Sequence, residues 1–450
     1  MFYLRDVMKK IIMGLLLVNL ITPAFADKIA IIGGGASGLV SAWLLEKDHE
    51  VTLFESTQRL GGHIETITLK VDGQSVLVES GAEFFNEVSY PHFLRLLRYL
   101  KIPLKTYTLV TNFYTVDDEH SIILPPYHDG TIETKSLTPG NVLRLLQLKN
   151  IVDYGKEIID SKDMNILLSD FIGTLSLTRD FKNDFFYPFL AAGWGINPED
   201  IQSSSAYIAL KYVIEGNSVG GYKWHEAETG LSSYIKAITN ALKSTTINLN
   251  SPIKSILRKN ERYVVTTEKG ESGTYDHVIM ATNANVAGDI LKDILDIQDV
   301  VSALHSVQYF DTKIAIHGDR RFMPAETKNW RVINIRYDGA HSAITIYKKW
   351  KSKTPIFKSW ITYDIRSPKD KGPAMPDNVY ALKSYRHPRT NQNYIHAQEL
   401  VKQVQGYRNI WFAGMWTLDN DSHESALVSA VKIGERLAPY SHRLRAIRGY

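Results

Sequence analysis

The sequence of 450 residues contains no cysteine. Disulfide bonds, thiolate metal sites and cysteine nucleophiles are therefore excluded. The sequence also lacks an H-E-x-x-H zinc motif and a serine hydrolase elbow, so we predict no metal site and no hydrolase chemistry. The net charge of +4 is too small to indicate a nucleic-acid partner. The composition, 44% hydrophobic and 22% charged, suits a globular chain of two domains.

The N-terminus has the pattern of a cleavable export signal. Two lysines precede the apolar stretch 11–21, and the sequence A-F-A at 24–26 forms a small-x-small cleavage site. We therefore predict a signal peptide at 1–26 and a periplasmic or secreted protein. The apolar stretch is about half of the roughly 20 residues that a membrane-spanning helix needs, and an uncleaved anchor is the alternative.

A glycine fingerprint, G-x-G-x-x-G, follows the export signal. It lies between an apolar, β-branched run at 28–32 and a helical pattern. In this context each glycine has its own task. Gly33 permits a tight turn, Gly35 lets the backbone approach a pyrophosphate, and Gly38 lets the helix pack on the strand.

Further groups around the fingerprint can bind the same ligand. The amides of Ala36 and Ser37 lie at the predicted helix N-terminus, where they can donate to phosphate. Glu55 ends the next predicted strand, and its carboxylate can accept hydrogen bonds from ribose hydroxyls. The pattern predicts dinucleotide binding within an α/β unit. A glycine-rich turn in an ordinary α/β unit is the alternative.

The segment "STQRLGGHIET" after Glu55 adds Arg59 and a second glycine pair, Gly61 and Gly62. Here the sequence resembles the flavin-containing amine oxidase superfamily, whose FAD domain carries R-x-G-G-R after the acid. His63 replaces the final arginine. Further motifs, "LGGH", "YP", "MP" ahead of "W", "W-F-x-G-x-W" and "H-E", resemble a bacterial branch of predicted NAD/FAD-binding proteins.

The resemblance implies a fold and a cofactor. We expect a Rossmann-type FAD-binding domain with a discontinuous, mixed α+β substrate domain, as in the amine oxidase or glutathione reductase-2-like fold. FAD would be bound non-covalently, because no cysteine can tether it. The expected FAD-binding segments are 27–79, 216–299 and 396–440, and the expected substrate segments are 80–215 and 300–395. The basic segment 441–450 is expected to be a solvated tail or to touch an anionic lipid surface.

The C-terminal motif has its own expected contact with the cofactor. "NIWFAGMW" predicts a buried strand that ends at Gly414, and the sequence D-S-H-E at 421–424 predicts the start of a helix. Free amides near Glu424 and Ala426 would face the flavin and stabilise its reduced, negatively charged form. A capped surface helix is the alternative.

The resemblance also suggests residues for the chemistry. Lys313 corresponds to a strand lysine that holds a water against flavin N5 in related oxidases, although a solvated strand residue is the alternative. Trp416 and Phe84 are the candidate walls of a substrate pocket. The aromatic residue that amine oxidases place before the helix-opening glutamate is here Ser422, which weakens the prediction of an amine substrate. His387 and His423 are possible acid or base groups, or structural histidines.

Two classes of function therefore remain. The first is an enzyme in which FAD accepts a hydride from a small-molecule amine or from an acyl or lipid-like substrate. The second is a non-catalytic carrier of hydrophobic ligands on the same fold. The intact glycine motifs favour the enzyme. The sequence indicates no oligomeric state.

Overall fold

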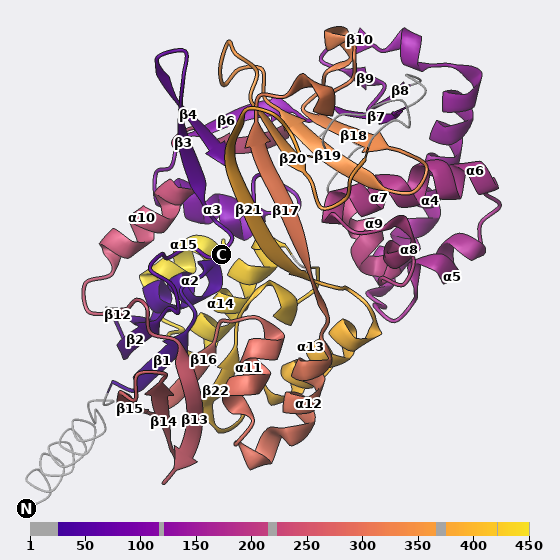
Figure 1. The fold of residues 1–450 in the computed structure, drawn as a ribbon. Coiled ribbons are helices and arrows are strands. Elements are labelled where there is room, and N and C mark those ends of the chain that lie inside the picture. Colours follow the sequence, from indigo (N-terminus) through magenta and orange to yellow (C-terminus); the bar gives the residue numbers. More distant parts are fainter. Residues whose placement is uncertain (1–25, 117–120, 215–222, 366–374, 421, 450) are drawn as a thin grey trace, which may run out of the picture.

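The central element is a parallel sheet of five strands in the order β12-β2-β1-β16-β22. The computed structural model describes residues 26–116, 121–214, 223–365, 375–420 and 422–449. The predicted leader therefore lies, apart from its last residue, outside the described residues. The five strands are β1 (Lys28–Ile32), β2 (Glu50–Phe54), β12 (Thr246–Asn248), β16 (His277–Met280) and β22 (Ile410–Phe412). All four pairings are parallel, as the Rossmann-type prediction requires (Figure 1).

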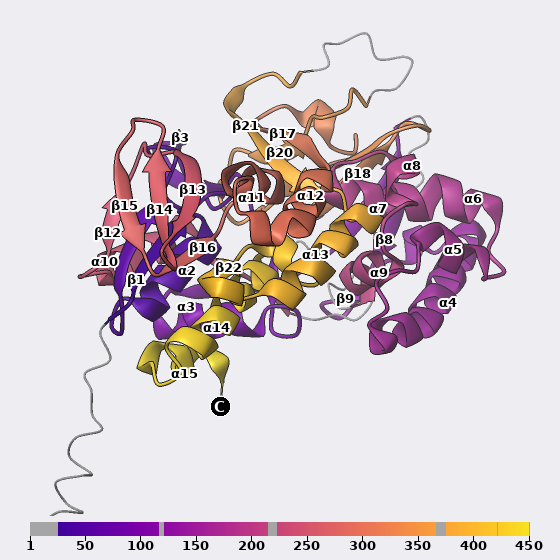
Figure 2. The ribbon, with the colours of Figure 1, turned by 90° about the horizontal axis from the view of Figure 1, so that it is seen from below.

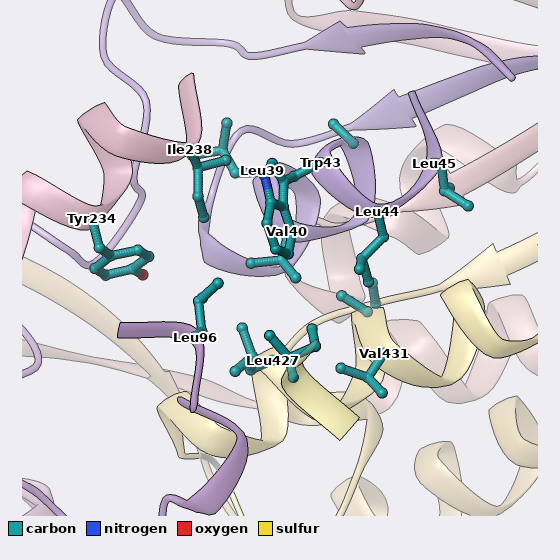
Figure 3. Packing of buried hydrophobic residues seen from close by; sticks show 14 of the residues in the cluster. Leu39, Val40, Trp43, Leu44, Leu45, Leu96, Tyr234, Ile238, Leu427 and Val431 are labelled. Atoms are coloured by element: carbon teal, nitrogen blue, oxygen red, sulfur yellow. The ribbon is translucent and has the colours of Figure 1, made fainter. Parts of the chain in front are cut away.

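Helices cover both faces of this sheet, because alternate residues of its central strand point to opposite cores. Ile29 and Ile31 belong to one core and Ala30 and Ile32 to the other. The first core contains α2 (Ala36–Leu45), α3 (Pro91–Tyr99), α10 (Ser232–Ala241) and α14 (His423–Leu437). Figure 3 shows side chains of these four helices packed together, among them Trp43, Leu96, Ile238 and Leu427.

The second core contains three helices that pack on one another, α11 (Ala284–Leu291), α12 (Gln298–Ser306) and α13 (Gln392–Val404) (Figure 2). An antiparallel sheet of β13 (Ile253–Lys259), β14 (Arg262–Thr267) and β15 (Ser272–Tyr275) lies beside them. The predicted domain boundary at 299 is therefore too early, because α12 belongs to the core of the parallel sheet.

A mixed sheet of seven strands forms the second domain, in the order β21-β17-β20-β19-β18-β7-β8. Only the β18–β7 pair is parallel. The strands are β7 (Thr111–Thr115), β8 (Ser121–Leu124), β17 (Tyr309–His317), β18 (Ile333–Tyr337), β19 (Ser342–Tyr347), β20 (Phe357–Trp360) and β21 (Val379–Pro388). Because these strands come from two separate parts of the chain, this sheet is discontinuous in sequence.

Helices and short strands complete the second domain. The helices include α4 (Pro139–Ser161), α5 (Leu168–Gly173), α7 (Tyr187–Trp194), α8 (Pro198–Ile201) and α9 (Ala206–Ile214). A hairpin of β3 (Thr66–Val71) and β4 (Gln74–Glu79) leaves the parallel sheet, and β5 (Phe85–Asn86), β11 (Lys223–Ala227) and β6 (Leu104–Thr108) form a small sheet. Within the described ranges, no helix is both long enough and apolar enough to cross a bilayer.

The C-terminal segment is a packed helix, which corrects the prediction of a solvated tail. Helix α15 (His442–Arg448) begins at the cap Ser441, whose hydroxyl accepts from the Leu444 amide. Leu444 and Ile447 are fully buried against the core of the parallel sheet. Arg443 donates to the Trp43 carbonyl at 2.6 Å, so part of the positive charge is used inside the fold.

Candidate functional site

The first glycine turn joins β1 to α2 and leaves one position open. Gly33 has φ +113°, and a Cβ on it would lie 2.4 Å from the Ala281 carbonyl oxygen. A Cβ on Gly38 would lie 1.9 Å from the Gly33 carbonyl oxygen. Gly35, in contrast, has no atom within 4 Å of its ideal Cβ and lines a cavity. The fold itself therefore requires Gly33 and Gly38, whereas Gly35 leaves room for a ligand.

The other predicted groups of this turn lie at the same cavity. Ala36 and Ser37, the first residues of α2, line it together with Glu55. The Glu55 carboxylate accepts hydrogen bonds from the amides of Gly34 and Thr57, each at 2.8 Å. The carboxylate is thus held at the end of β2, beside the glycine turn.

The second glycine turn packs directly on the first. The Gly61 amide donates to the Gly34 carbonyl at 2.8 Å, and Gly61 and Gly62 both have positive φ and line the cavity. Arg59 differs from its prediction, because it is not among the residues that line the cavity. Its guanidinium donates to the carbonyls of Ile64 and Gly62, at 2.7 and 2.6 Å. Arg59 therefore stabilises the turn.

The cavity has a volume of about 1320 Å³, above the range of about 300–1,000 Å³ that is usual for small-molecule sites. It extends from the two glycine turns to the seven-stranded sheet. On the sheet side its wall is largely apolar, with Leu109, Phe189, Ile314, Ile333, Ile335, Ile344 and Trp360. The space therefore suits a dinucleotide together with a second, largely apolar ligand.

The C-terminal motif reaches the cavity at the end of β22. Gly414 has φ +140° and lines the cavity. Helix α14 begins within the segment 421–424 that predicted a helix start, and its N-cap is Ser422, whose hydroxyl accepts from the Ser425 amide at 3.1 Å. The Ala426 amide donates to the Ser422 carbonyl at 3.2 Å, so Ala426 lines the cavity without the free amide that was predicted.

Glu424 has a role that the sequence did not suggest. Its carboxylate accepts from the amides of His92 and Phe93, at 2.9 and 3.0 Å, and from the His92 ring at 2.7 Å. These amides belong to the first turn of α3, so the carboxylate caps a neighbouring helix. Glu424 also lines the cavity, where its backbone amide has no acceptor among the described residues.

The prediction for Lys313 is wrong in its placement. Lys313 is exposed and does not line the cavity, whereas the next residue, Ile314, is buried and does. Side chains alternate along β17, so a strand that directs Ile314 to the cavity must direct Lys313 away from it. The alternative of a solvated strand residue describes Lys313.

A different lysine lines the cavity. Lys358, on β20, is 2% exposed. Its ammonium donates to the Gly81 carbonyl at 2.7 Å and to the Glu83 carboxylate at 3.0 Å. Lys358 was not among the predicted site residues, although a lysine inside the short apolar segment "FKSW" is a recognisable signal of a buried charge.

Neutral histidines form another part of the wall. Burial and the nearby His387 and Arg59 lower the pKa of His63 to about 3, and burial lowers the pKa of His423 to about 4. The His63 ring lies 5.1 Å from that of Tyr385 and 5.5 Å from that of His387, between centroids. All four side chains line the cavity, and His63, His423 and Tyr385 present uncharged polar groups there near neutral pH.

The two predicted pocket residues also lie at the cavity. Trp416 is buried and donates through Nε1 to the Thr282 carbonyl at 2.8 Å. Phe84 packs edge-on against Trp224, with 6.2 Å between ring centroids. Both predicted walls are thus held in place by contacts with neighbouring residues of the cavity wall.

This geometry agrees with comparisons to known proteins. The family model for flavin containing amine oxidoreductase matches residues 36–375. The chain therefore belongs to the flavin-containing amine oxidoreductases and is a flavin-dependent oxidoreductase. The predicted family and fold class are confirmed.

Individual relatives are more distant. Protoporphyrinogen oxidase of Saccharomyces cerevisiae is 41% identical over 66 residues, which is 14% of this chain and only 12% of the yeast protein. The CLA-producing fatty acid isomerase of P. acnes is 15% identical, with a TM-score of 0.68 over 92% of this chain and 99% of that one. Cyclohexylamine oxidase of Brevibacterium oxydans is 14% identical, with a TM-score of 0.63 over the same shares of the two chains. The two structures share the fold.

The open space at Gly35 predicts a variant that loses the flavin and keeps the fold. Gly35→Val directs a branched side chain into the cavity from a backbone, φ −71° and ψ −175°, that valine tolerates. We expect the free energy of unfolding of the cofactor-free variant, measured with urea, to lie within about 0.5 kcal/mol of that of the cofactor-free wild type. Flavin absorbance per protein, after reconstitution, should fall to the background.

A matched control is Gly140→Val, in the first turn of α4, where a Cβ also meets nothing within 4 Å. Gly140 does not line the cavity, so this variant should keep both the stability and the flavin. A wild-type flavin content in Gly35→Val would show that the cofactor phosphates bind elsewhere.

The lowered pKa of His63 predicts a pH dependence of stability. The unfolded chain binds a proton at His63 below a pH of about 6.5, whereas the folded protein resists protonation down to about 3. The free energy of unfolding therefore falls as the pH drops between these values. His63→Gln should reduce this slope by about 1.4 kcal/mol per pH unit, as measured by urea unfolding at several pH values.

The control is His396→Gln, at an exposed position of α13, which reports the effect of the same substitution outside the cavity. If His63→Gln and wild type have parallel pH profiles, His63 is not buried as a neutral group.

Proposed function

We propose that the flavin is FAD, bound non-covalently at the two glycine turns. The observation that carries this proposal is the open space at Gly35 beside the held carboxylate of Glu55. Phosphates need close access to the backbone, and ribose hydroxyls need an acceptor. The chain has no cysteine to form a thioether with the flavin. Bound FAD would supply the acceptor for a hydride.

The substrate is a small molecule, an amine or an acyl or lipid-like compound. The apolar wall formed by β18, β19 and α7 supports a substrate with a large apolar part. The solved structures with the same fold include an oxidase named for cyclohexylamine and an isomerase named for a fatty acid, so both classes fit this architecture.

The residues of this chain would orient the substrate and exclude water from it. Trp416 and Phe84 form fixed aromatic walls, and the apolar sheet face excludes water. His63 is neutral near pH 7 and has no hydrogen-bond partner among the described residues, so its ring can form a hydrogen bond with a polar group of the substrate as an uncharged donor or acceptor.

The direct test of the cofactor is the colour of the purified protein. We expect a yellow protein with the absorption bands of oxidised flavin. Denaturation by acid or heat should release intact FAD into the supernatant, because nothing tethers it. A colourless protein that takes up no FAD on reconstitution contradicts the proposal, and so does flavin that stays with the precipitated chain.

We also propose that the protein acts outside the cytoplasm, in the periplasm or after secretion. The support is the n-region, apolar stretch and A-F-A site within residues 1–26. N-terminal sequencing of protein from the native host should begin at or near Asp27, in a fraction released without breaking the cells open. A full-length chain in washed membranes would show that the leader is an anchor.

A further inference from the structure

Five charged side chains form an alternating chain that begins at the cavity wall. Lys358 contacts Glu83 at 3.0 Å, and Lys348 contacts the other oxygen of Glu83 at 2.7 Å. Lys348 also contacts Glu226 at 2.9 Å, and Lys351 contacts Glu226 at 3.2 Å. Lysines stand at both ends, so three positive charges face two negative ones. Lys351 is the partly exposed end, with 22% of its side chain accessible, and Lys358 is the end at the cavity.

The two glutamates in this row of five charges, Glu83 and Glu226, are ionised. Burial alone would raise the pKa of Glu83, but Lys348 and Lys358 lower it to about 2. The pKa of Glu226 is also lowered, by Lys348 and Lys351, against the effect of burial. Glu83 therefore shares one negative charge between two lysines, and the charge of Lys358 is only partly compensated. A buried charge that is partly compensated is costly until a counter-ion approaches it.

Nearby titratable groups leave this positive end in place. Burial raises the pKa of Glu79 to about 7, so near neutral pH this carboxyl carries only part of a negative charge. His63 and His423, on the same cavity, are neutral. An ammonium group has three N–H donors. Two of those of Lys358 are used by Gly81 and Glu83, and the third has no acceptor among the described residues.

The wall around Lys358 would not hold an ammonium ion. Its neighbours on the cavity are the apolar residues of the seven-stranded sheet with Phe84 and Trp360, whose rings already lie 5.4 Å from the Lys348 ammonium and 5.2 Å from the Lys358 ammonium. Glu83 is the acid on this part of the wall, and both of its oxygens already bind lysine. A positively charged ligand group would meet the like charge of the Lys358 ammonium. A negatively charged ligand group would instead accept a hydrogen bond from this ammonium, in a part of the wall with little water.

We propose that the cavity binds an apolar chain ending in a carboxylate, with the carboxylate at Lys358 and the chain along the sheet face. This inference rests on the proposed function for the oxidation of the bound compound by flavin. The binding of the carboxylate itself does not depend on the proposed function. The inference selects an acyl carboxylate over an amine. Lys358 would position the substrate, and the charges behind it would hold the ammonium in place.

The test follows intrinsic tryptophan fluorescence, because four tryptophans line the cavity, Trp194, Trp224, Trp360 and Trp416. Decanoate, decanol and decylamine are titrated into the wild-type protein near neutral pH. Decanoate should bind about 10- to 100-fold more tightly than decanol, the value of one charge-assisted hydrogen bond. Decylamine should bind no more tightly than decanol. A preference for decylamine, equal affinities, or binding by none of the three overturns the proposal.

A pair of variants assigns the effect to one lysine. Lys358→Met should weaken decanoate binding to the level of decanol and leave decanol binding unchanged. Lys313→Met, the same change at an exposed position one strand away, should bind all three as the wild type does. Unchanged decanoate binding in Lys358→Met overturns the role of Lys358. If this variant does not fold, the order of affinities in the wild type still decides.

The two proposals can fail separately. The fluorescence titration can be carried out with or without bound flavin, so a colourless protein that prefers decanoate would contradict the oxidase proposal and retain this one. A yellow protein that prefers decylamine would do the reverse.

Discussion

The contact between the first strand and the first helix is the constraint on which the rest of the site depends. A Cβ at Gly38 would lie 1.9 Å from the Gly33 carbonyl, so α2 can begin where it does only because position 38 has no side chain. This close approach places the N-terminus of α2 at the cavity. Helix α14 packs on α2, so the same contact also brings the C-terminal motif to the cavity (Figure 1).

The cavity joins parts of the chain that are far apart in sequence. Its glycine turns come from residues near 33 and 61, its apolar wall from four strands between 314 and 360, and its far side from residues 414–426. The alternating charges reach this space from β11, from β20 and from the segments around Glu83 and Lys348. A flavin oxidoreductase is thereby given a chamber whose apolar sheet face carries the buried Lys358.

Local signals in the sequence predicted much of this arrangement. The fingerprint glycines and Glu55 were placed correctly at their strand and helix ends, and the start of α14 was placed within the segment 421–424, because backbone conformation and capping depend on nearby residues. The Rossmann-type fold class followed from the same pattern and is confirmed. Trp416 and Phe84 were predicted as pocket walls, Trp416 because it directly follows a predicted strand end, and both lie at the cavity.

The failures concern information that the local sequence does not hold. Alternation divides β17 into two faces but does not say which face meets the cavity, so Lys313 was chosen and Lys358 was missed. Arg59 was assigned to the ligand because the carbonyls of its own turn were not visible as partners. The buried positions Leu444 and Ile447, three residues apart in a basic segment, did carry a helical signal.

The central claim is that flavin and substrate occupy one continuous cavity. The most direct measurement is the visible difference spectrum of the flavin-loaded protein during a titration with decanoate. The account predicts a shift in the flavin bands that saturates at the same decanoate concentration as the tryptophan quenching, because the alkyl chain of decanoate would lie against the flavin. Saturated quenching with an unchanged flavin spectrum would place the two ligands in separate sites and contradict the account.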